Sequence, residues 1–389
     1  MSDEISWSVL NQSHSPSFVR MLGRLSAHLG SCRLLTGMEQ ERTVDGVRTA
    51  RGPGYTRTSL SRRLLSWCAF MLWVSPRVLF GAKPKQILAL TNPPMLPQLA
   101  WLTWKLRGVP YSLIIWDLYP DHVVTQGWMS ASHPVVRTWR VLNRWAFDGA
   151  QAVITLGPSM ANAVAQQMSS PERLHVVPNW ADVSELVPLD YDENAFAQTH
   201  AHADRVTVLY SGNMGASHGL EGLVEAMSAL PEELPVEALL IGDGLGRQTI
   251  EERLEARPIP RLKLMDYQPW EVIPRSLATG DVAVVAQAAD SAHLSVPSKT
   301  YSALAVGSAI LAITPRDSDL GRLVIEEGVG WVCEPGDTAA LVGVLRSIPE
   351  DRDGLSRAQT AARALAERRF SEDAVAAEFQ RILFHEVTS

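Results

Sequence analysis

The chain has 389 residues, of which 46% are apolar and 20% are charged, and its 42 acidic and 35 basic side chains give a net charge of −7. This composition excludes a disordered chain, and the length predicts two domains. The three cysteines offer neither a disulfide framework nor a C-x-x-C pair, which favours a reducing cytoplasm. The acidic start MSDEISWSVL differs from a secretory signal. The overall acidity argues against nucleic acid as a partner.

The cations are concentrated in one segment. Residues 46–116 contain ten Lys or Arg side chains and no Asp or Glu, so the rest of the chain carries a net charge of −17. An apolar, Trp-rich run inside this segment ends at Pro76, too short to cross a bilayer, which takes about 20 residues. The run favours contact with an anionic membrane surface, and a buried helix that begins with solvated arginines is the alternative. The side chains expected at this membrane or acceptor contact are Arg62, Arg63, Trp67, Phe70 and Trp73.

Short β-branched or aromatic runs alternate with longer runs of helical period. The alternation predicts βαβ units and parallel sheets, an α/β fold with two doubly wound, Rossmann-like domains that face each other across a cleft. The domains are expected at 1–180 and 205–370, with an acidic linker at 181–204 and a C-terminal helix at 371–389 that packs back on the first domain. Strands are expected at 86–90, 111–116, 152–156, 206–210, 236–241, 262–265, 282–285 and 309–313, and helices at 97–107, 134–147 and 220–230.

Two glycine-rich turns follow predicted strands of the second domain. The turn from Gly212 to Gly219 precedes a helix, so its amides could hold a phosphate; an ordinary β–α turn is the alternative. The turn at Gly242 resembles a dinucleotide fingerprint, but Arg247 stands where the third glycine is needed. The chain has no P-loop motif, and the His200 and His202 pair has no framework for a metal.

Lys299 falls in the predicted first turn of a helix that starts at Pro297 and Ser298. A cation there opposes the helix dipole, which favours an anionic partner such as a diphosphate; a solvated surface lysine is the alternative. In the first domain, Asp117 follows a strand and faces the expected cleft, either as a functional carboxylate or as a turn cap.

Together these pieces resemble the GT-B glycosyltransferases of retaining family 4, in the bacterial polysaccharide, O-antigen and capsule branch that has a Pro-Ser-Lys donor motif. The resemblance covers roughly residues 85–340. The landmarks that carry it are Thr91-Asn92-Pro93-Pro94, Trp116-Asp117-Leu118-Tyr119-Pro120, Val177-Pro178-Asn179-Trp180-Ala181-Asp182, Tyr210-Ser211-Gly212-Asn213-Met214-Gly215, Gly242-Asp243-Gly244 and Val296-Pro297-Ser298-Lys299.

The chain departs from the family pattern at four positions. Asn213 and His218 stand where many relatives carry an Arg and a Lys that grip the donor diphosphate. Leu294 and Ser302 stand where two glutamates are usual, and the neutral Ser302 implies an altered hold on the ribose.

The resemblance implies a hexosyltransferase that needs no metal or other cofactor. It would move a sugar from a nucleotide donor, UDP by branch resemblance, to a lipid-diphosphate-linked saccharide on the cytoplasmic face of the inner membrane. Asp117 and Lys299 are the expected catalytic residues. The expected donor-binding residues are Gly212, Asn213, Gly215, His218, Gly242, Tyr267, Ser298, Lys299, Tyr301 and Ser302.

Three other functions are compatible with the same sequence. The chain could transfer sugar to a soluble acceptor, although its basic, aromatic segment favours a lipid. It could be a GT-B relative that binds ligands without catalysis, which the missing Glu and Arg or Lys side chains favour. A sugar-nucleotide 2-epimerase would need acidic groups in the cleft, which positions 294 and 302 lack.

Overall fold

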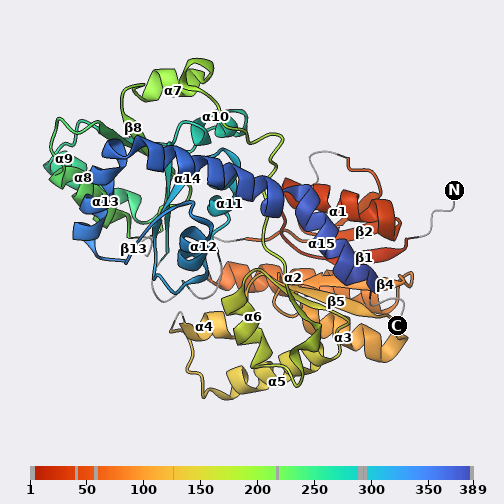
Figure 1. Cartoon of the computed structure of the whole chain (residues 1–389). Coiled ribbons are helices and arrows are strands. Elements are labelled where there is room, and N and C mark those ends of the chain that lie inside the picture. Colours follow the sequence, from red (N-terminus) through yellow and green to blue (C-terminus); the bar gives the residue numbers. More distant parts are fainter. Residues whose placement is uncertain are drawn as a thin grey trace. The chain divides into compact units, whose positions relative to one another are not determined.

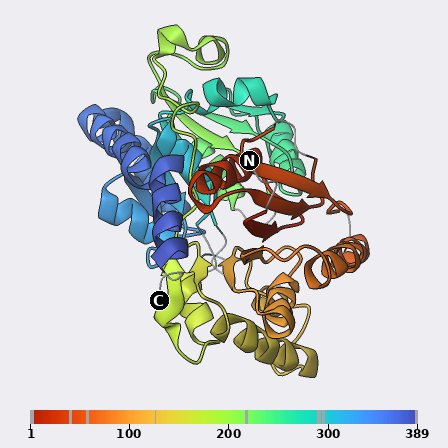
Figure 2. The ribbon, with the colours of Figure 1, turned by 90° about the vertical axis from the view of Figure 1, so that its right-hand side faces the viewer.

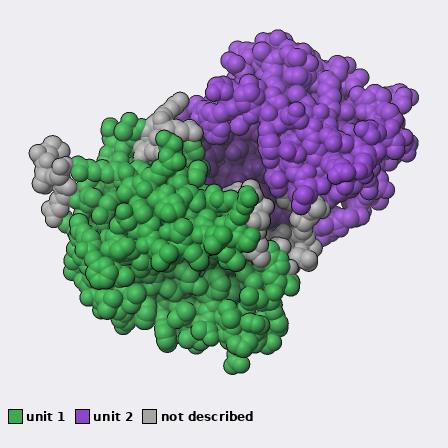
Figure 3. All heavy atoms as spheres, turned by 180° about the vertical axis from the view of Figure 1, so that it is seen from behind, with its two compact units in different colours: residues 1–178, 375–389 green, residues 179–374 purple. Residues whose placement is uncertain are grey.

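The computed structural model describes residues 5–39, 43–56, 60–125, 127–215, 219–287, 292 and 296–385. The chain forms two compact units, coloured separately in Figure 3. Unit 1 comprises residues 1–178 and 375–389, and unit 2 comprises residues 179–374.

Unit 1 is built on a parallel sheet with the order β3-β2-β1-β4-β5-β6-β7 within its described residues. Strands β2 and β3 lie on one side of β1, and β4 to β7 lie on the other side. The strand order therefore switches between β1 and β4, which are paired in parallel. Such a switch point leaves a crevice at the carboxyl ends of the two strands, where α/β folds bind ligands. The strands are β1 (Trp7–Leu10), β2 (Cys32–Thr36), β3 (Val47–Arg51), β4 (Gln86–Leu90), β5 (Tyr111–Ile115), β6 (Val153–Thr155) and β7 (Leu174–Val176).

Helices bury the strands of unit 1. Ser15 caps α1 by accepting a hydrogen bond from the Phe18 amide, and Phe18, Leu22 and Leu25 form its buried side. On the other helical layer, side chains of α2 and α3 share one core with alternate residues of β4 and β5. The helical elements are α1 (Pro16–Leu29), α2 (Leu60–Leu79), α3 (Leu96–Arg107), α4 (Asp121–Thr125), α5 (Pro134–Asp148), α6 (Pro158–Ala165), the 3₁₀ turn η1 (Pro171–Arg173) and α15 (Glu372–His385).

Unit 2 repeats the plan with the order β10-β9-β8-β11-β12-β13 among its described strands, all paired in parallel. Its switch point lies between β8 and β11. The strands are β8 (Val206–Ser211), β9 (Val236–Ile241), β10 (Leu262–Met265), β11 (Val282–Ala286), β12 (Ala309–Ile313) and β13 (Gly330–Cys333).

Both faces of the unit 2 sheet are covered by helices (Figures 1 and 2). Val282 and Val284 of β11 belong to one apolar core, whereas Ala283 and Val285 belong to another, as expected from side chains that alternate along a strand. The helical elements are η2 (Tyr191–Glu193), α7 (Ala195–His200), α8 (Leu220–Ala229), α9 (Arg247–Ala256), η3 (Trp270–Val272), α10 (Ile273–Leu277), α11 (Lys299–Ala305), α12 (Asp319–Glu327), α13 (Thr338–Glu350), α14 (Arg352–Leu365) and the π-helical turn η5 (Ala366–Phe370).

The segment 181–204, expected to be a linker, belongs to unit 2 and is anchored there. Asn194 caps α7 and also donates hydrogen bonds to the Arg275 carbonyl (2.9 Å) and Thr279 Oγ1 (3.1 Å). The Arg363 guanidinium of α14 donates to the carbonyls of Leu186 (2.8 Å) and Val183 (3.0 Å). Residues 181–204 form turns and the short helix α7, which is why their acidic sequence has no strand pattern.

Helix α15 begins next to Ser371, whose Oγ accepts a hydrogen bond from the Ala374 amide at 3.2 Å. From Val375 onward the helix belongs to unit 1, where the Gln380 side chain lies 3.0 Å from His28 Nδ1. Among the helices that the structure describes, none combines the length and the apolar character needed to cross a membrane.

Candidate functional site

Two glycines at the carboxyl ends of β8 and β9 let the loops that follow these strands approach closely. Gly212 follows β8 with φ +135°, and Gly242 follows β9 with φ +144°. A Cβ on Gly242 would lie only 2.0 Å from the Gly212 carbonyl oxygen, so no other residue fits there. The Gly212 amide donates to the Ile241 carbonyl (2.9 Å) and the Met214 amide to the Asp243 carbonyl (2.7 Å).

These hydrogen bonds correct one expectation for the glycine-rich turn. We expected the amides from Gly212 to Gly215 to hold a phosphate, but the amides of Gly212 and Met214 are used to join the loops after β8 and β9. Glycine is favoured at 212 by its φ of +135°, and a Cβ there would lie 3.2 Å from Lys299 Nζ.

Arg247 holds this edge of the sheet together, a role that the sequence did not reveal. Its Nη1 donates to the carbonyls of Gly242 (2.6 Å) and Met265 (3.1 Å), and its other nitrogens pair with Asp266 (2.9 Å) and Glu251 (2.7 Å). The arginine that breaks the dinucleotide fingerprint therefore ties the loops after β9 and β10 to α9.

Lys299 is the first residue of α11, so it lies in the first turn as predicted, although the helix begins after Ser298 rather than at Pro297. Its Nζ lies 3.8 Å from the centroid of the Tyr210 ring and has no hydrogen-bond partner among the described residues. Burial lowers the pKa of Lys299 to about 8. A buried ammonium without a hydrogen-bonding partner is costly, and an aromatic face offsets only part of that cost. An anion next to Nζ would offset the rest of this free-energy cost of burial.

The other expected donor residues differ in accessibility. Ser298 and Tyr267 are exposed, Ser302 is half-buried one helical turn after Lys299, and the Tyr267 hydroxyl lies 3.5 Å from the Asp243 carbonyl. The Asn213 side chain lies over Gly244, where a Cβ would be 2.8 Å from Oδ1. His218 and Leu294 lie outside the described residues, and Gly215 is the last described residue before one such gap.

The expectation that Tyr301 binds the donor is wrong for its side chain. Tyr301 is 2% exposed and packs edge-on against Phe370, with ring centroids 5.0 Å apart. Two residues beyond Lys299, it projects from the opposite side of α11 into the core.

Asp117 lies at the carboxyl edge of the unit 1 sheet, directly after β5, and is exposed. Thr91, which follows β4, accepts hydrogen bonds at Oγ1 from the amides of Trp116 (3.2 Å) and Asp117 (3.1 Å). The neighbouring strands thereby fix the backbone that carries the carboxylate.

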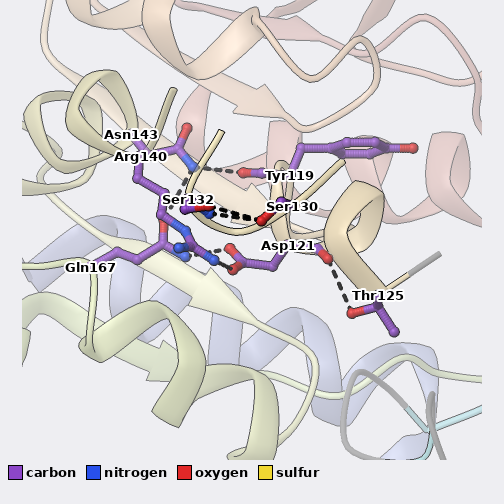
Figure 4. Close-up of polar contacts among 8 residues, drawn as sticks. All are labelled: Tyr119, Asp121, Thr125, Ser130, Ser132, Arg140, Asn143 and Gln167. Atoms are coloured by element: carbon purple, nitrogen blue, oxygen red, sulfur yellow. Dashed lines mark hydrogen bonds and ion pairs between the residues drawn. The ribbon is translucent and has the colours of Figure 1, made fainter. Parts of the chain in front are cut away.

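A buried polar network supports the segment after Asp117 (Figure 4). Asn143 Nδ2 donates to the Tyr119 carbonyl (2.6 Å) and to Gln167 Oε1 (3.2 Å). Asp121 accepts from Arg140 (2.5 Å) and from Gln167 Nε2 (2.7 Å). These contacts join the segment 119–121 to α5 and to the end of α6, and no sequence motif predicted them.

Helix α2 corrects two expectations for the apolar run. The helix continues through Pro76 to Leu79, and Phe70 is fully buried in the unit 1 core with Val74 and Val78, one turn apart. Phe70 is therefore not a membrane contact. Arg62 is exposed, whereas Arg63, Trp67 and Trp73 are half-buried.

Within the described ranges, no group of three or more His, Cys, Asp or Glu side chains is arranged to hold a metal ion.

Two family models match the chain, one in each half. Residues 19–180 match the "Glycosyl transferase 4-like domain", and residues 192–365 match "Glycosyl transferases group 1". Both matches support glycosyltransferase activity.

Curated relatives and solved structures agree with these matches. The chain is 26% identical over 264 residues to WbjE of Pseudomonas aeruginosa, named a probable glycosyltransferase, covering 68% of this chain and 66% of the relative. It is 27% identical to WcaI of Escherichia coli (strain K12), whose name links it to colanic acid biosynthesis as a glycosyl transferase, covering 71% of this chain and 68% of the relative. The chain thus spans about two thirds of the length of each.

The structure of Anabaena HepE in complex with UDP superposes with a TM-score of 0.74 at 17% identity, covering 97% of this chain and 99% of that one. At this identity the superposition shows the fold alone, which is the pair of Rossmann-like domains of GT-B enzymes. The chain therefore has the GT-B fold, with a first region that matches the glycosyl transferase 4-like domain and a second that matches the glycosyl transferases group 1 domain.

Proposed function

We propose that this protein is a retaining, metal-independent hexosyltransferase that uses a UDP-sugar and a lipid-diphosphate-linked saccharide in the biosynthesis of a cell-surface polysaccharide. The observation that carries the proposal is Lys299, an ammonium without a hydrogen-bond partner among the described residues, at the switch point of unit 2. A nucleoside diphosphate supplies the anion that this position lacks. The UDP in the HepE complex supports the same choice of nucleotide.

In the proposed reaction, Lys299 stabilises the negative charge that develops on the leaving diphosphate. The acceptor hydroxyl oxygen bonds to the anomeric carbon on the face from which the diphosphate leaves. The bond from that carbon to the diphosphate oxygen breaks, and the hydroxyl proton passes to the departing phosphate oxygen. Asp117 orients the transferred sugar or the acceptor hydroxyl, while Ser302 and Tyr267 contact the ribose and the base.

A lipid acceptor is supported by the outer side of α2. Leu65 and Leu72 are 68% and 78% exposed, and Leu106 of the adjacent α3 is 66% exposed. Two cations lie over tryptophans nearby, Arg77 on Trp73 at 4.3 Å and Lys105 on Trp104 at 4.2 Å. Exposed leucines beside cations favour an anionic membrane surface. We call Leu65, Leu72, Arg77, Lys105 and Leu106 the membrane face, and we propose that it holds the enzyme to the cytoplasmic leaflet of the inner membrane.

The first test is ligand binding. Thermal unfolding of the wild-type chain and of Lys299→Ala would be followed with UDP, UDP-hexoses and GDP-hexoses, and Arg346→Ala, an exposed cation of α13, serves as the control. A ligand that binds the native state raises the melting temperature according to its affinity. We expect UDP compounds to raise the melting temperature of the wild type and the control but not of Lys299→Ala. Equal shifts in all three proteins would contradict the role of Lys299.

The main competing function is a GT-B protein that binds a nucleotide without catalysis, which the neutral side chains Asn213 and Ser302 favour. Hydrolysis of a UDP-sugar in the absence of acceptor separates the two functions. A transferase releases free sugar slowly, whereas a binding protein releases none above the buffer control.

A further inference from the structure

One cation of α2 lies among aromatic side chains at the carboxyl edge of the unit 1 sheet. We call this group the Arg63 site. Its members come from the segments that follow β3, β4 and β5, from the start of α2 and from the turn after α4, all within unit 1. The members are Tyr55, Arg63, Trp67, Asn92, Tyr119 and Trp128.

The Arg63 guanidinium lies close to two indole rings. Its Cζ is 5.5 Å from the centroid of the Trp67 ring and 5.3 Å from that of Trp128, within the range of cation–π attraction. Its Nε is buried without a hydrogen-bond partner, and no carboxylate in the part of the chain that the structure describes forms an ion pair with it. A half-buried guanidinium without an ion-pair partner among the described residues is suited to a phosphate or carboxylate from outside the chain.

The rings around Arg63 hold one another in place. Trp67 stacks on Tyr55 at 6.4 Å with an interplanar angle of 7°, and meets Tyr119 edge-on at 5.7 Å. Trp67 Nε1 also donates to Asn92 Oδ1 at 3.1 Å, and Asn92 follows β4 at the switch point of unit 1. A site whose side chains are already ordered loses little entropy when a ligand binds.

The position of the Arg63 site on α2 relates it to the membrane face. Arg63 and Leu65 are two residues apart, so they project from different sides of the helix. Leu65 is exposed, whereas Arg63 is turned toward the sheet edge with Trp67. One helix thereby presents an apolar side to lipid and a cation to the sheet edge where Asp117 lies.

We propose that the Arg63 site binds the diphosphate of the lipid-linked acceptor, with Arg63 as the cationic ligand and the faces of Tyr55, Trp67 and Trp128 against the adjoining sugar or isoprenoid. The assignment rests on the proposed function for the identity of the lipid. The sequence left Arg63 and Trp67 as a membrane or an acceptor contact, and this proposal assigns both to the acceptor.

The test is calorimetric titration of the full chain with farnesyl diphosphate, at saturating UDP so that the Lys299 site is filled. The proteins are the wild type, Arg63→Ala, Arg63→Lys and the control Arg346→Ala, with melting temperatures measured to confirm folding. One charge-assisted hydrogen bond to a phosphate corresponds to roughly tenfold or more in affinity. We expect Arg63→Ala to weaken binding at least tenfold, Arg63→Lys to weaken it less, and the control to match the wild type. Binding by Arg63→Ala within twofold of the wild type would overturn the proposal.

Two further titrations identify the source of the phosphate. Phosphatidylglycerol vesicles should bind Arg63→Ala as well as they bind the wild type, and inorganic diphosphate should bind more weakly than farnesyl diphosphate. Vesicle binding that falls in Arg63→Ala while farnesyl diphosphate binding is unchanged would make Arg63 a membrane contact and overturn the proposal.

Hydrolysis of the UDP-sugar keeps the two proposals distinguishable. If farnesyl diphosphate binding depends on Arg63 but no UDP-sugar is hydrolysed or transferred, the proposed function fails and the Arg63 site stands. If sugar is transferred and Arg63→Ala leaves the KM for a lipid-diphosphate acceptor unchanged, the site fails and the proposed function stands.

Discussion

The Lys299 ammonium at the start of α11 lies 3.8 Å from the centroid of the Tyr210 ring of β8 and beside Gly212, where a Cβ would be 3.2 Å from Nζ. We expect Lys299→Ala to reduce turnover at least tenfold, because one charged contact to a leaving diphosphate contributes about 1.5–3 kcal/mol. The melting temperature of the unliganded protein should not fall, since the substitution removes a buried charge without a hydrogen-bonding partner. Steady-state kinetics with a UDP-sugar and thermal unfolding check both parts. Unchanged turnover would exclude Lys299 from the reaction.

Burial lowers the pKa of Lys299 to about 8, from 10.5 for an exposed lysine, and this gives donor binding a pH dependence. The diphosphate binds the protonated amine, so the affinity for UDP should be constant well below pH 8 and fall as the pH rises through about 8. The Lys299→Met variant lacks the group and should not show this fall. Calorimetric titration with UDP between pH 6.5 and 9.5 measures the affinity of both proteins. Parallel profiles would contradict the assignment.

The same titration affects stability with a definite sign. Between the native pKa of about 8 and the value of 10.5 for the unfolded chain, the unfolded state binds more protons at Lys299 than the native state does. The free energy of unfolding should therefore rise with pH in this window relative to that of Lys299→Met.

The strands were predictable because a parallel sheet buries both faces, which produces continuous apolar runs. The predicted strands at 86–90, 236–241, 262–265 and 309–313 coincide with β4, β9, β10 and β12. The strands β1, β2, β3, β7 and β13 were not predicted. Three of them, β3, β7 and β13, lie at the edges of their sheets, and Val47–Arg51 and Leu174–Val176 contain no continuous apolar run.

Side-chain direction was harder to predict than the elements. The run around Phe70 is apolar on every side, so nothing in its pattern distinguishes the buried Phe70, Val74 and Val78 from the exposed Leu72. Tyr301 and Lys299 are neighbours in one motif, yet the helix turns them to opposite sides. The roles of Arg247 and Asn143 depend on carbonyls distant in sequence, which no local pattern encodes.

Asn143 should matter to the unit 1 site although it lies beneath the segment 117–121. The side chain is 3% exposed, donates to the Tyr119 carbonyl and accepts from Gln98 Nε2 at 2.8 Å. Asn143→Ala leaves these buried groups without partners, and we expect it to lower the free energy of unfolding by about 1–3 kcal/mol. Because the loop that carries Asp117 loses its support, the KM for acceptor should rise while the affinity for UDP stays unchanged.

The control for Asn143→Ala is Ser132→Ala. Ser132 is drawn in the same view as Asn143 (Figure 4). Ser132 is exposed and bonds only Ser130 among the residues drawn, at 2.9 Å. The Ser132→Ala variant should leave both the KM for acceptor and the free energy of unfolding unchanged. An equal rise in acceptor KM in both variants would show that the loop after α4, rather than the buried network, controls the acceptor.

The membrane face is tested by placing a charge where α2 presents an exposed leucine. Leu72→Glu removes an apolar side chain that would enter the membrane interface, and the anionic lipid repels the carboxylate that replaces it. Binding to phosphatidylglycerol vesicles should therefore weaken roughly tenfold or more. The matched control is Ile325→Glu, an exposed apolar residue of α12 in unit 2, which should bind as the wild type does. Because Leu72 is 78% exposed, neither the fold nor the hydrolysis of a UDP-sugar without acceptor should change. Co-sedimentation at low and high salt measures the binding, and a Leu72→Glu variant that sediments like the Ile325→Glu control would remove α2 from the membrane contact.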